Sequence, residues 1–157
     1  MKCLQNLLLF PWWVINKNFA IRKIISWVCF VWNGNQKKIH GDGNIVTIRT
    51  HGSQLKKVIF EINGDHNQVV IKDGAQVQNI RVVMRGSHHT LEIGERCYIT
   101  GESFWFEDYG CKITIGNDTS IQSVHIAATE PGRKVEIGED CLLAYHIDIR
   151  TGDSHSV

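Results

Sequence analysis

The sequence predicts an all-β protein, a parallel β-helix of about five coils with about 22 residues each, behind a short N-terminal segment. Apolar residues recur at a fixed interval of 22 residues. Within each repeat, apolar residues two positions apart show strand spacing, which excludes a helix. A repeat of this length is typical of solenoids, whose units bury their apolar faces only by stacking. The columns with this step are Val69, Leu91, Ile113, Val135 and Val157; Ile71, Ile93, Ile115 and Ile137; Val77, Ile99, Ile121 and Leu143; and Val83, Trp105, Ala127 and Ile149.

Each repeat divides into two six-residue pieces and a ten-residue third piece, as in 93–98, 99–104 and 105–114. Each six-residue piece opens with an aliphatic residue, which we expect to point inward, and has a small residue four positions later. The longer third piece predicts a four-residue insertion at the third corner. Small residues share one column, and a glycine directly follows the column isoleucine in three successive repeats, which predicts a tight backbone there. These positions are Ala75, Cys97, Thr119 and Cys141, and Gly94, Gly116 and Gly138.

Residues 1–36 form an apolar, Trp-rich segment and linker, separate from the repeats at 37–157. The first 33 residues carry four of the five tryptophans, and the polar run at 33–36 is interpreted as the linker. Polar residues interrupt the apolar stretch well short of the roughly 20 residues that a membrane span needs. Two alternatives stay open: a helical segment that covers the first coil, or an amphipathic one that makes peripheral membrane contact through residues 1–32.

Composition excludes several functions. Lys and Arg number 17 against 16 Asp and Glu, so no global field recruits nucleic acid. Five cysteines without a C-x-x-C pair argue against a disulfide framework and a zinc ribbon. His88 and His89 are adjacent, and no spacing completes a metal-binding set around them. His125 is interpreted as a turn or core histidine, because it lies four residues after Ile121.

The segments Ile93-Gly-Glu-Arg-Cys97, Ile115-Gly-Asn-Asp-Thr119 and Ile137-Gly-Glu-Asp-Cys141 resemble the hexapeptide-repeat acyltransferases, in particular the polysaccharide sugar O-acetyltransferases. The likeness covers about 40–157 and is most specific at 127–130 and 152–156. It implies a left-handed parallel β-helix, usually a homotrimer, that transfers an acetyl group from its co-substrate acetyl-CoA to a hydroxyl of a sugar or polysaccharide precursor. A cytoplasmic location, peripheral to a membrane if the N-terminal segment binds one, and no metal are expected.

The residue that matches the family's general base is His155. An imidazole with a pKa near 6.5 can take a proton from a hydroxyl that attacks a thioester. Asp153, on the same loop, is expected to orient the ring or bind the acceptor. The 22-residue step places His89, Cys111 and Arg133 in the column of His155, which predicts a site along this edge. Thr129 and Glu130, one coil before Thr151 and Gly152, are then expected to contact the acceptor, with Arg133 beside them.

The sequence departs from the family at its end. The chain stops at Val157, whereas family members continue with coils that build much of the acetyl-CoA site, so no residue is assigned to that co-substrate. The expectation is the N-terminal part of an O-acetyltransferase of surface polysaccharide synthesis. The alternative is a non-catalytic β-helix remnant, or a scaffold or binding subunit that a partner completes.

Overall fold

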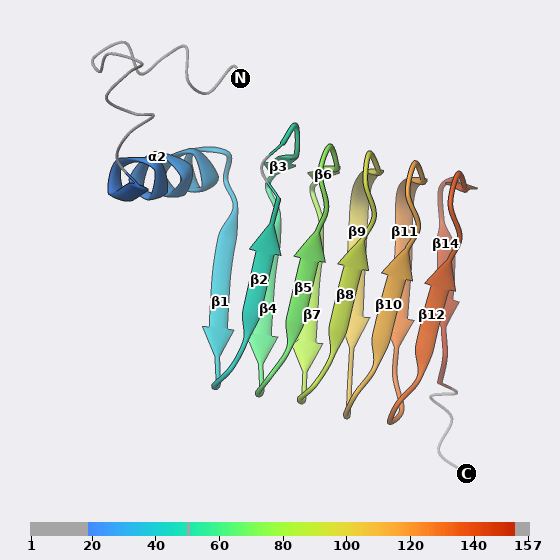
Figure 1. Cartoon of the computed structure of the whole chain (residues 1–157). Helices are drawn as coiled ribbons and strands as arrows, with labels where there is room; N and C mark the ends of the chain where they lie inside the picture. The colour runs from blue at the N-terminus through green and yellow to red at the C-terminus, as the bar shows by residue number, and fades with distance from the viewer. Residues whose placement is uncertain (1–18, 50, 153–157) are drawn as a thin grey trace.

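The computed structural model describes residues 19–49 and 51–152, in which one helix precedes a parallel β-helix (Figure 1). In the figure the near strands run upward and the fainter far strands downward while the coils advance from left to right, so the β-helix is left-handed as expected. The elements are α2 (Phe19–Trp32), β1 (Gln36–His40), β2 (Ile45–Ile48), β3 (Gln54–Lys56), β4 (Ile59–Asn63), β5 (Gln68–Ile71), β6 (Gln76–Gln78), β7 (Arg81–Arg85), β8 (Thr90–Ile93), β9 (Tyr98–Phe106), β10 (Lys112–Ile115), β11 (Ser120–Ala128), β12 (Lys134–Ile137), β13 (Leu142–Leu143) and β14 (Ile147–Arg150).

Parallel pairing confirms the predicted columns through the middle coils. One sheet has the order β12-β10-β8-β5-β2, and within it Leu91 is opposite Ile113 and Ile93 is opposite Ile115. The other sheet forms the two remaining faces of the β-helix. Strands β9 and β11 each bend at the second corner, which lies between these two faces, and so belong to both. Strand β7 ends at residue 85 and β8 begins at residue 90, so the four-residue insertion lies at the third corner as predicted.

The core is the stack of inward-pointing side chains, one layer per coil. Ile71, Ile93 and Ile115 are buried and Ile137 is partly buried, and the largest fully buried side chains of the core are Phe60, Phe104 and Phe106. Ala75, Cys97 and Thr119 are also buried, which confirms the small-residue column. Burial of such apolar surface is worth about 25 cal/mol per Å², so stacking of coils is the main source of stability.

The glycines after the column isoleucines allow successive coils to approach closely. A Cβ added at Gly116 would lie 2.5 Å from the carbonyl carbon of Gly138, and one at Gly94 would lie 2.7 Å from the carbonyl carbon of Gly116. Neither residue has a positive φ. Their role is therefore to leave room between coils.

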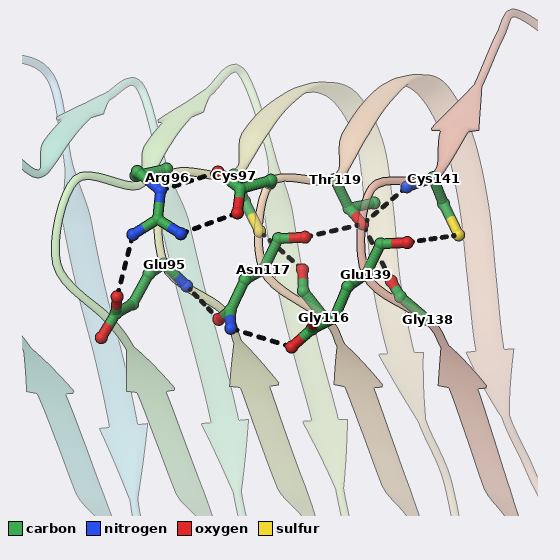
Figure 2. Close-up of polar contacts among 10 residues, drawn as sticks. Glu95, Arg96, Cys97, Gly116, Asn117, Thr119, Gly138, Glu139 and Cys141 are labelled. Atoms are coloured by element: carbon green, nitrogen blue, oxygen red, sulfur yellow. Dashed lines mark hydrogen bonds and ion pairs between the residues drawn. The ribbon is translucent and has the colours of Figure 1, made fainter.

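At the first corner, which contains the glycines after the column isoleucines, side chains form hydrogen bonds with backbone groups of the next coil (Figure 2). The Thr119 hydroxyl donates to the Gly138 carbonyl oxygen at 2.9 Å and accepts from the Cys141 N–H at 3.2 Å. The Cys97 thiol donates to the Gly116 carbonyl oxygen at 3.0 Å. The residues of the small-residue column therefore fit the tight corner and also supply hydrogen-bonding groups.

An outer polar row runs beside that column in Figure 2. Asn117 accepts from the Glu95 N–H at 2.9 Å and donates to Glu139 at 3.0 Å. The Arg96 guanidinium donates two hydrogen bonds of 2.7 Å to Asp118, which lowers the pKa of that carboxyl. Both charged groups are solvent-exposed, so this pair contributes little to stability.

The third corner carries a ladder, buried from Asn67 onward, in which each side chain accepts a hydrogen bond from the next coil. Asn44 accepts from the Asn67 N–H and Asn67 from the His89 N–H, both at 2.9 Å, and His89 accepts from the Cys111 N–H at 3.2 Å. His89 and Cys111 are 0% exposed. The prediction that this column lines an accessible site is therefore wrong for these two residues, because their side chains point into the core.

Two coils contain 23 residues instead of 22. In the first, Ile48 is opposite Ile71, and in the last, Ile126 is opposite Ile149. The predicted column through Val83, Trp105 and Ala127 therefore continues to Arg150, and the assignment of Ile149 to it is wrong. The extra residue lies in the turn between β13 and β14.

The N-terminal segment is described from residue 19. Phe30 of α2 packs against the core, whereas Trp27, Val31 and Trp32 are exposed. Asn35, interpreted as part of the linker, is buried: it accepts from the Val58 N–H at 2.9 Å and donates to the carbonyl oxygens of Phe30 and Leu55 at 3.0 Å. No helix in the described part of the chain is both long enough and apolar enough to cross a bilayer.

Candidate functional site

A groove of about 510 Å³ lies on the outer face of β9, β11 and β14 and extends onto the third corner. Its volume falls within the range of small-molecule sites. Polar and charged side chains surround an aromatic and a small apolar residue. The lining residues are Trp105, Glu107, Asp108, His125, Ala127, Thr129, Glu130, Arg150 and Gly152.

The floor of this groove is formed by residues of the long strands β9 and β11. Each contains one non-glycine residue with positive φ, Glu102 at 68° and Ser123 at 54°, which turns the chain at the second corner. After this corner, alternate side chains point inward, and in β9 these are Phe104 and Phe106. The residues between them, such as Trp105, face outward.

Trp105 is the aromatic surface of the groove. The guanidinium carbon of Arg85, from β7, lies 4.7 Å from the centroid of its ring. Such a cation–π contact restrains the indole and offsets part of the cost of its partial exposure. The indole therefore offers a flat, largely apolar surface to the groove.

His125 is the only histidine that lines the groove within the described residues. Its Nδ1 atom is 2.8 Å from the Ser103 hydroxyl oxygen. By strand register, Ser103 and Asp148 are the neighbours of His125 on the preceding and following coils. The interpretation of His125 as a turn or core histidine is therefore wrong, since it is a half-buried residue on the outer face of β11.

Arg150 forms an ion pair at the edge of the groove. Its guanidinium donates three hydrogen bonds of 2.8 to 3.0 Å to the Asp148 carboxylate. These bonds lower the pKa of Asp148 and raise that of Arg150. Both side chains are about half exposed, so this ion pair contributes little to the stability of the fold. It holds the two charged groups in fixed positions at the edge of the groove.

On the opposite wall of the groove, threonine side chains connect two successive coils. The Thr151 hydroxyl donates to the Thr129 carbonyl oxygen at 2.8 Å and accepts from the Thr129 N–H at 3.0 Å. A Cβ at Gly152 would overlap the Thr129 hydroxyl, so only glycine fits at this point of the groove. Arg133 donates a hydrogen bond from Nε to the Glu130 carboxylate at 3.0 Å, and its Nη2 atom forms an ion pair with the same carboxylate at 3.0 Å.

The structure brings together part of the predicted site. Thr129 and Glu130 line the groove, and Arg133 binds Glu130 without lining it. Asp153 and His155 lie outside the described residues. Among residues 19–49 and 51–152, no group of three or more His, Cys, Asp or Glu side chains is arranged to hold a metal ion.

The coils define the class of fold, a parallel β-helix with repeats of about 22 residues. No protein-family profile matches the chain. The chain is 27% identical over 117 residues to the polysialic acid O-acetyltransferase of Neisseria meningitidis, a match that covers 74% of this chain and 53% of the relative. The crystal structure of the polySia-specific acetyltransferase NeuO matches with a TM-score of 0.67 at 23% identity, over 80% of this chain and 56% of NeuO.

These matches confirm the predicted resemblance: the chain is similar in sequence to a polysialic acid O-acetyltransferase and has a parallel β-helix fold like that of NeuO. The structural match by itself establishes the fold. The chain spans about half the length of the relatives that it matches.

Proposed function

We propose that this chain is the acceptor-binding part of an O-acetyltransferase that moves an acetyl group from acetyl-CoA to a hydroxyl of a sugar or polysaccharide. One observation carries the proposal: a groove of sugar size lies three residues before His155 along the chain, since its lining ends with Gly152. The sequence similarity to a polysialic acid O-acetyltransferase supports the same reaction.

In this mechanism the groove binds the acceptor. Trp105 offers a face for a sugar ring, and carboxylates such as Glu130 accept hydrogen bonds from sugar hydroxyls. Arg133 holds the Glu130 carboxylate in place. His155 is proposed as the general base that takes the proton from the attacking hydroxyl, and Asp153 is proposed to orient its ring or to bind the acceptor. Fixing acceptor and base in one geometry supplies much of the rate enhancement.

The proposal extends to a homotrimer in the cytoplasm, which the resemblance supports. Sedimentation of the purified protein measures this directly. A trimer is expected, and a monomer at micromolar concentration would contradict this part without affecting the proposed reaction.

The reaction is tested by incubating the protein with acetyl-CoA and polysaccharide acceptors, polysialic acid and neutral oligosaccharides among them. Release of the free thiol and the mass of the acceptor report transfer. His155→Ala should lower the rate by about 10²-fold or more, the size of a general-base contribution. His51→Ala changes an exposed histidine away from the groove and should leave the rate unchanged. Full activity of His155→Ala would exclude His155 as the base.

A further inference from the structure

Three exposed aromatic rings lie in a row along the third corner, each on a successive coil. The rings of His66 and His88 are stacked, with centroids 5.1 Å apart and planes 6° from parallel, and the ring of Tyr109 follows at 5.0 Å from His88. All three residues are exposed, Tyr109 to 57%. Together they form the aromatic ridge. The turns of the third corner, which carry it, lie along the lower edge of Figure 1.

The fold does not require the two histidine rings. Both residues have positive φ, 56° at His66 and 62° at His88, a region in which glycine has no steric cost. The backbone hydrogen bonds between coils place Gly110 and Gly132 at the equivalent position of the next two coils, also with positive φ. Glycine therefore forms this turn equally well, and the imidazoles have no part in making it.

The polar atoms of the ridge are available to a ligand. Within the described residues, neither the ring nitrogens of His66 and His88 nor the Tyr109 hydroxyl has a hydrogen-bond partner. The neighbouring His89 differs, because it is buried and both of its ring nitrogens have partners inside the protein. An imidazole offers a donor and an acceptor, and a phenol hydroxyl offers both, so the ridge matches the hydroxyl groups of sugars.

The ridge is continuous with the groove. Asp108, the residue before Tyr109, lines the groove, and so does Glu130 on the following coil. Two residues after Glu130, the Gly132 N–H donates to the Tyr109 carbonyl oxygen at 2.8 Å. A Cβ added at Gly110 or Gly132 would meet no atom within 4 Å, so the turn of the following coil leaves open space beside Tyr109. A molecule in the groove therefore reaches the ridge without crossing a wall of side chains.

We propose that the aromatic ridge binds the continuation of a sugar chain whose reacting sugar lies in the groove, so that the acceptor is a polymer of several sugars; this rests on the acceptor site proposed above. The ring centroids are 5.0 to 5.1 Å apart, close to the spacing of the coils. One sugar adds a similar length to an extended chain, so successive sugars meet successive rings. Tyr109 binds the sugar next to the groove, and His88 and His66 bind the two beyond it.

The surroundings of the ridge favour a sugar chain over a protein or a membrane. Asp65 precedes His66 and Asp108 precedes Tyr109, and both carboxylates are exposed. The ridge is one ring wide, so it lacks the contiguous apolar patch that marks a protein interface or a membrane-binding surface. An aromatic ring with a polar tip suits a sugar, which has apolar C–H faces and hydroxyl groups at its rim.

The dependence of transfer on acceptor length tests this role. Transfer from acetyl-CoA is measured with oligosialic acids and with neutral glucose oligomers, each from a single sugar to about eight. In a series that the protein acetylates, KM should fall with length and level off at about four sugars, one in the groove and one for each ring, while kcat stays nearly constant. A KM that does not change with length in either series would overturn the inference.

Three variants locate the binding on the ridge. Tyr109→Ala should raise KM for the longer acceptors by about 10-fold and leave KM for a single sugar unchanged. His88→Gly and His66→Gly introduce the residue that neighbouring turns already use at this position. They should shorten the length at which KM levels off to about two and about three sugars, respectively. Variants that all keep the profile of the parent would overturn the inference.

Tyr145→Ala is the matched control. Tyr145 is 66% exposed in the turn before β14 and does not line the groove, so this variant should keep the length profile of the parent. Thermal unfolding of all variants checks that each folds.

Saturation-transfer NMR with the same oligomers, in the absence of acetyl-CoA, separates this inference from the proposed function. Absence of transfer to every acceptor would overturn the proposed function. Binding that tightens with length and weakens in Tyr109→Ala would still support the ridge. Binding that is absent, or equal in the parent and in Tyr109→Ala, would overturn the inference whether or not the parent transfers.

Discussion

The Nδ1 atom of His89 accepts a hydrogen bond from the backbone N–H of Cys111, one coil further along the chain, at 3.2 Å. The other ring nitrogen, Nε2, is 3.1 Å from the carbonyl oxygen of Arg85. A carbonyl oxygen only accepts, so Nε2 carries the proton and Nδ1 does not. The folded structure therefore requires the neutral form of this buried ring.

Stability should decrease as the solution becomes acidic. Burial lowers the pKa of His89 below its ordinary value of 6.5, so the unfolded chain binds this proton more readily than the folded protein. The contribution is fully present above about pH 6.5 and is lost as the pH falls through that value toward the lower folded pKa. Urea unfolding between about pH 8 and pH 5 measures it. The dependence should be smaller in His89→Asn, and an identical dependence would assign it to other groups.

At position 89, a hydrogen-bond acceptor should matter more for the stability of the fold than the imidazole ring does. His89→Asn should keep most of the stability, because Asn67 already performs this role one coil earlier. His89→Leu leaves the Cys111 N–H without its acceptor and should cost about 1–3 kcal/mol of unfolding free energy. Denaturant unfolding of both variants separates the two effects. Equal stability of the Asn and Leu variants would show that the hydrogen bond contributes nothing.

Two glycines in one column should respond differently to alanine. Gly116→Ala places a Cβ 2.5 Å from the Gly138 carbonyl group, so successive coils must separate, at a cost of about 1–3 kcal/mol. At Gly138 the nearest group to an added Cβ is the Cys141 sulfur at 3.7 Å, an ordinary contact. Gly138→Ala should therefore change unfolding free energy by less than about 0.5 kcal/mol. Thermal unfolding compares them, and similar losses would refute the role of coil spacing.

The hydroxyl of Thr119 should be worth more than its methyl group. Thr119→Val keeps the shape but removes both hydrogen bonds to the next coil, which should cost about 1–3 kcal/mol. Thr119→Cys should cost less, because Cys97 fills the same column and donates to the Gly116 carbonyl oxygen. Chemical denaturation ranks the variants. A valine variant as stable as the parent would show that these backbone groups find other partners.

The repeat was predictable because the inward columns obey one physical rule in every coil. Burial selects an aliphatic residue at the same register position each time, so the 22-residue step is visible in the sequence, and β8 pairs with β10 as that step requires. The two longer coils were not predictable from this rule. The extra residue before β14 lies in a turn, where no burial constrains the sequence, and it shifts Arg150 into the column expected for Ile149.

The candidate site was predictable only in part. Thr129 and Glu130 could be placed near Gly152, because the predicted step of 22 residues differs by only one residue from the step of 23 in the last coil. His125 could not be recognised as an outward-facing groove residue from its spacing after Ile121. The positive φ at Ser123 changes which side chains of β11 face outward beyond that point. The 22-residue step from Ser103 to His125 was the available signal, and the additional residue in the last coil hid its continuation to Asp148.

The third-corner ladder has a consequence for how such a molecule changes length during evolution. Asn44, Asn67 and His89 each hold only the coil that follows, so no side chain in the ladder depends on a coil further away. Duplication or loss of one in-frame 22-residue unit among the middle coils would preserve every neighbour relationship on either side of the change. The β-helix can therefore lengthen or shorten by whole coils while the groove at β11 and β14 keeps its local geometry.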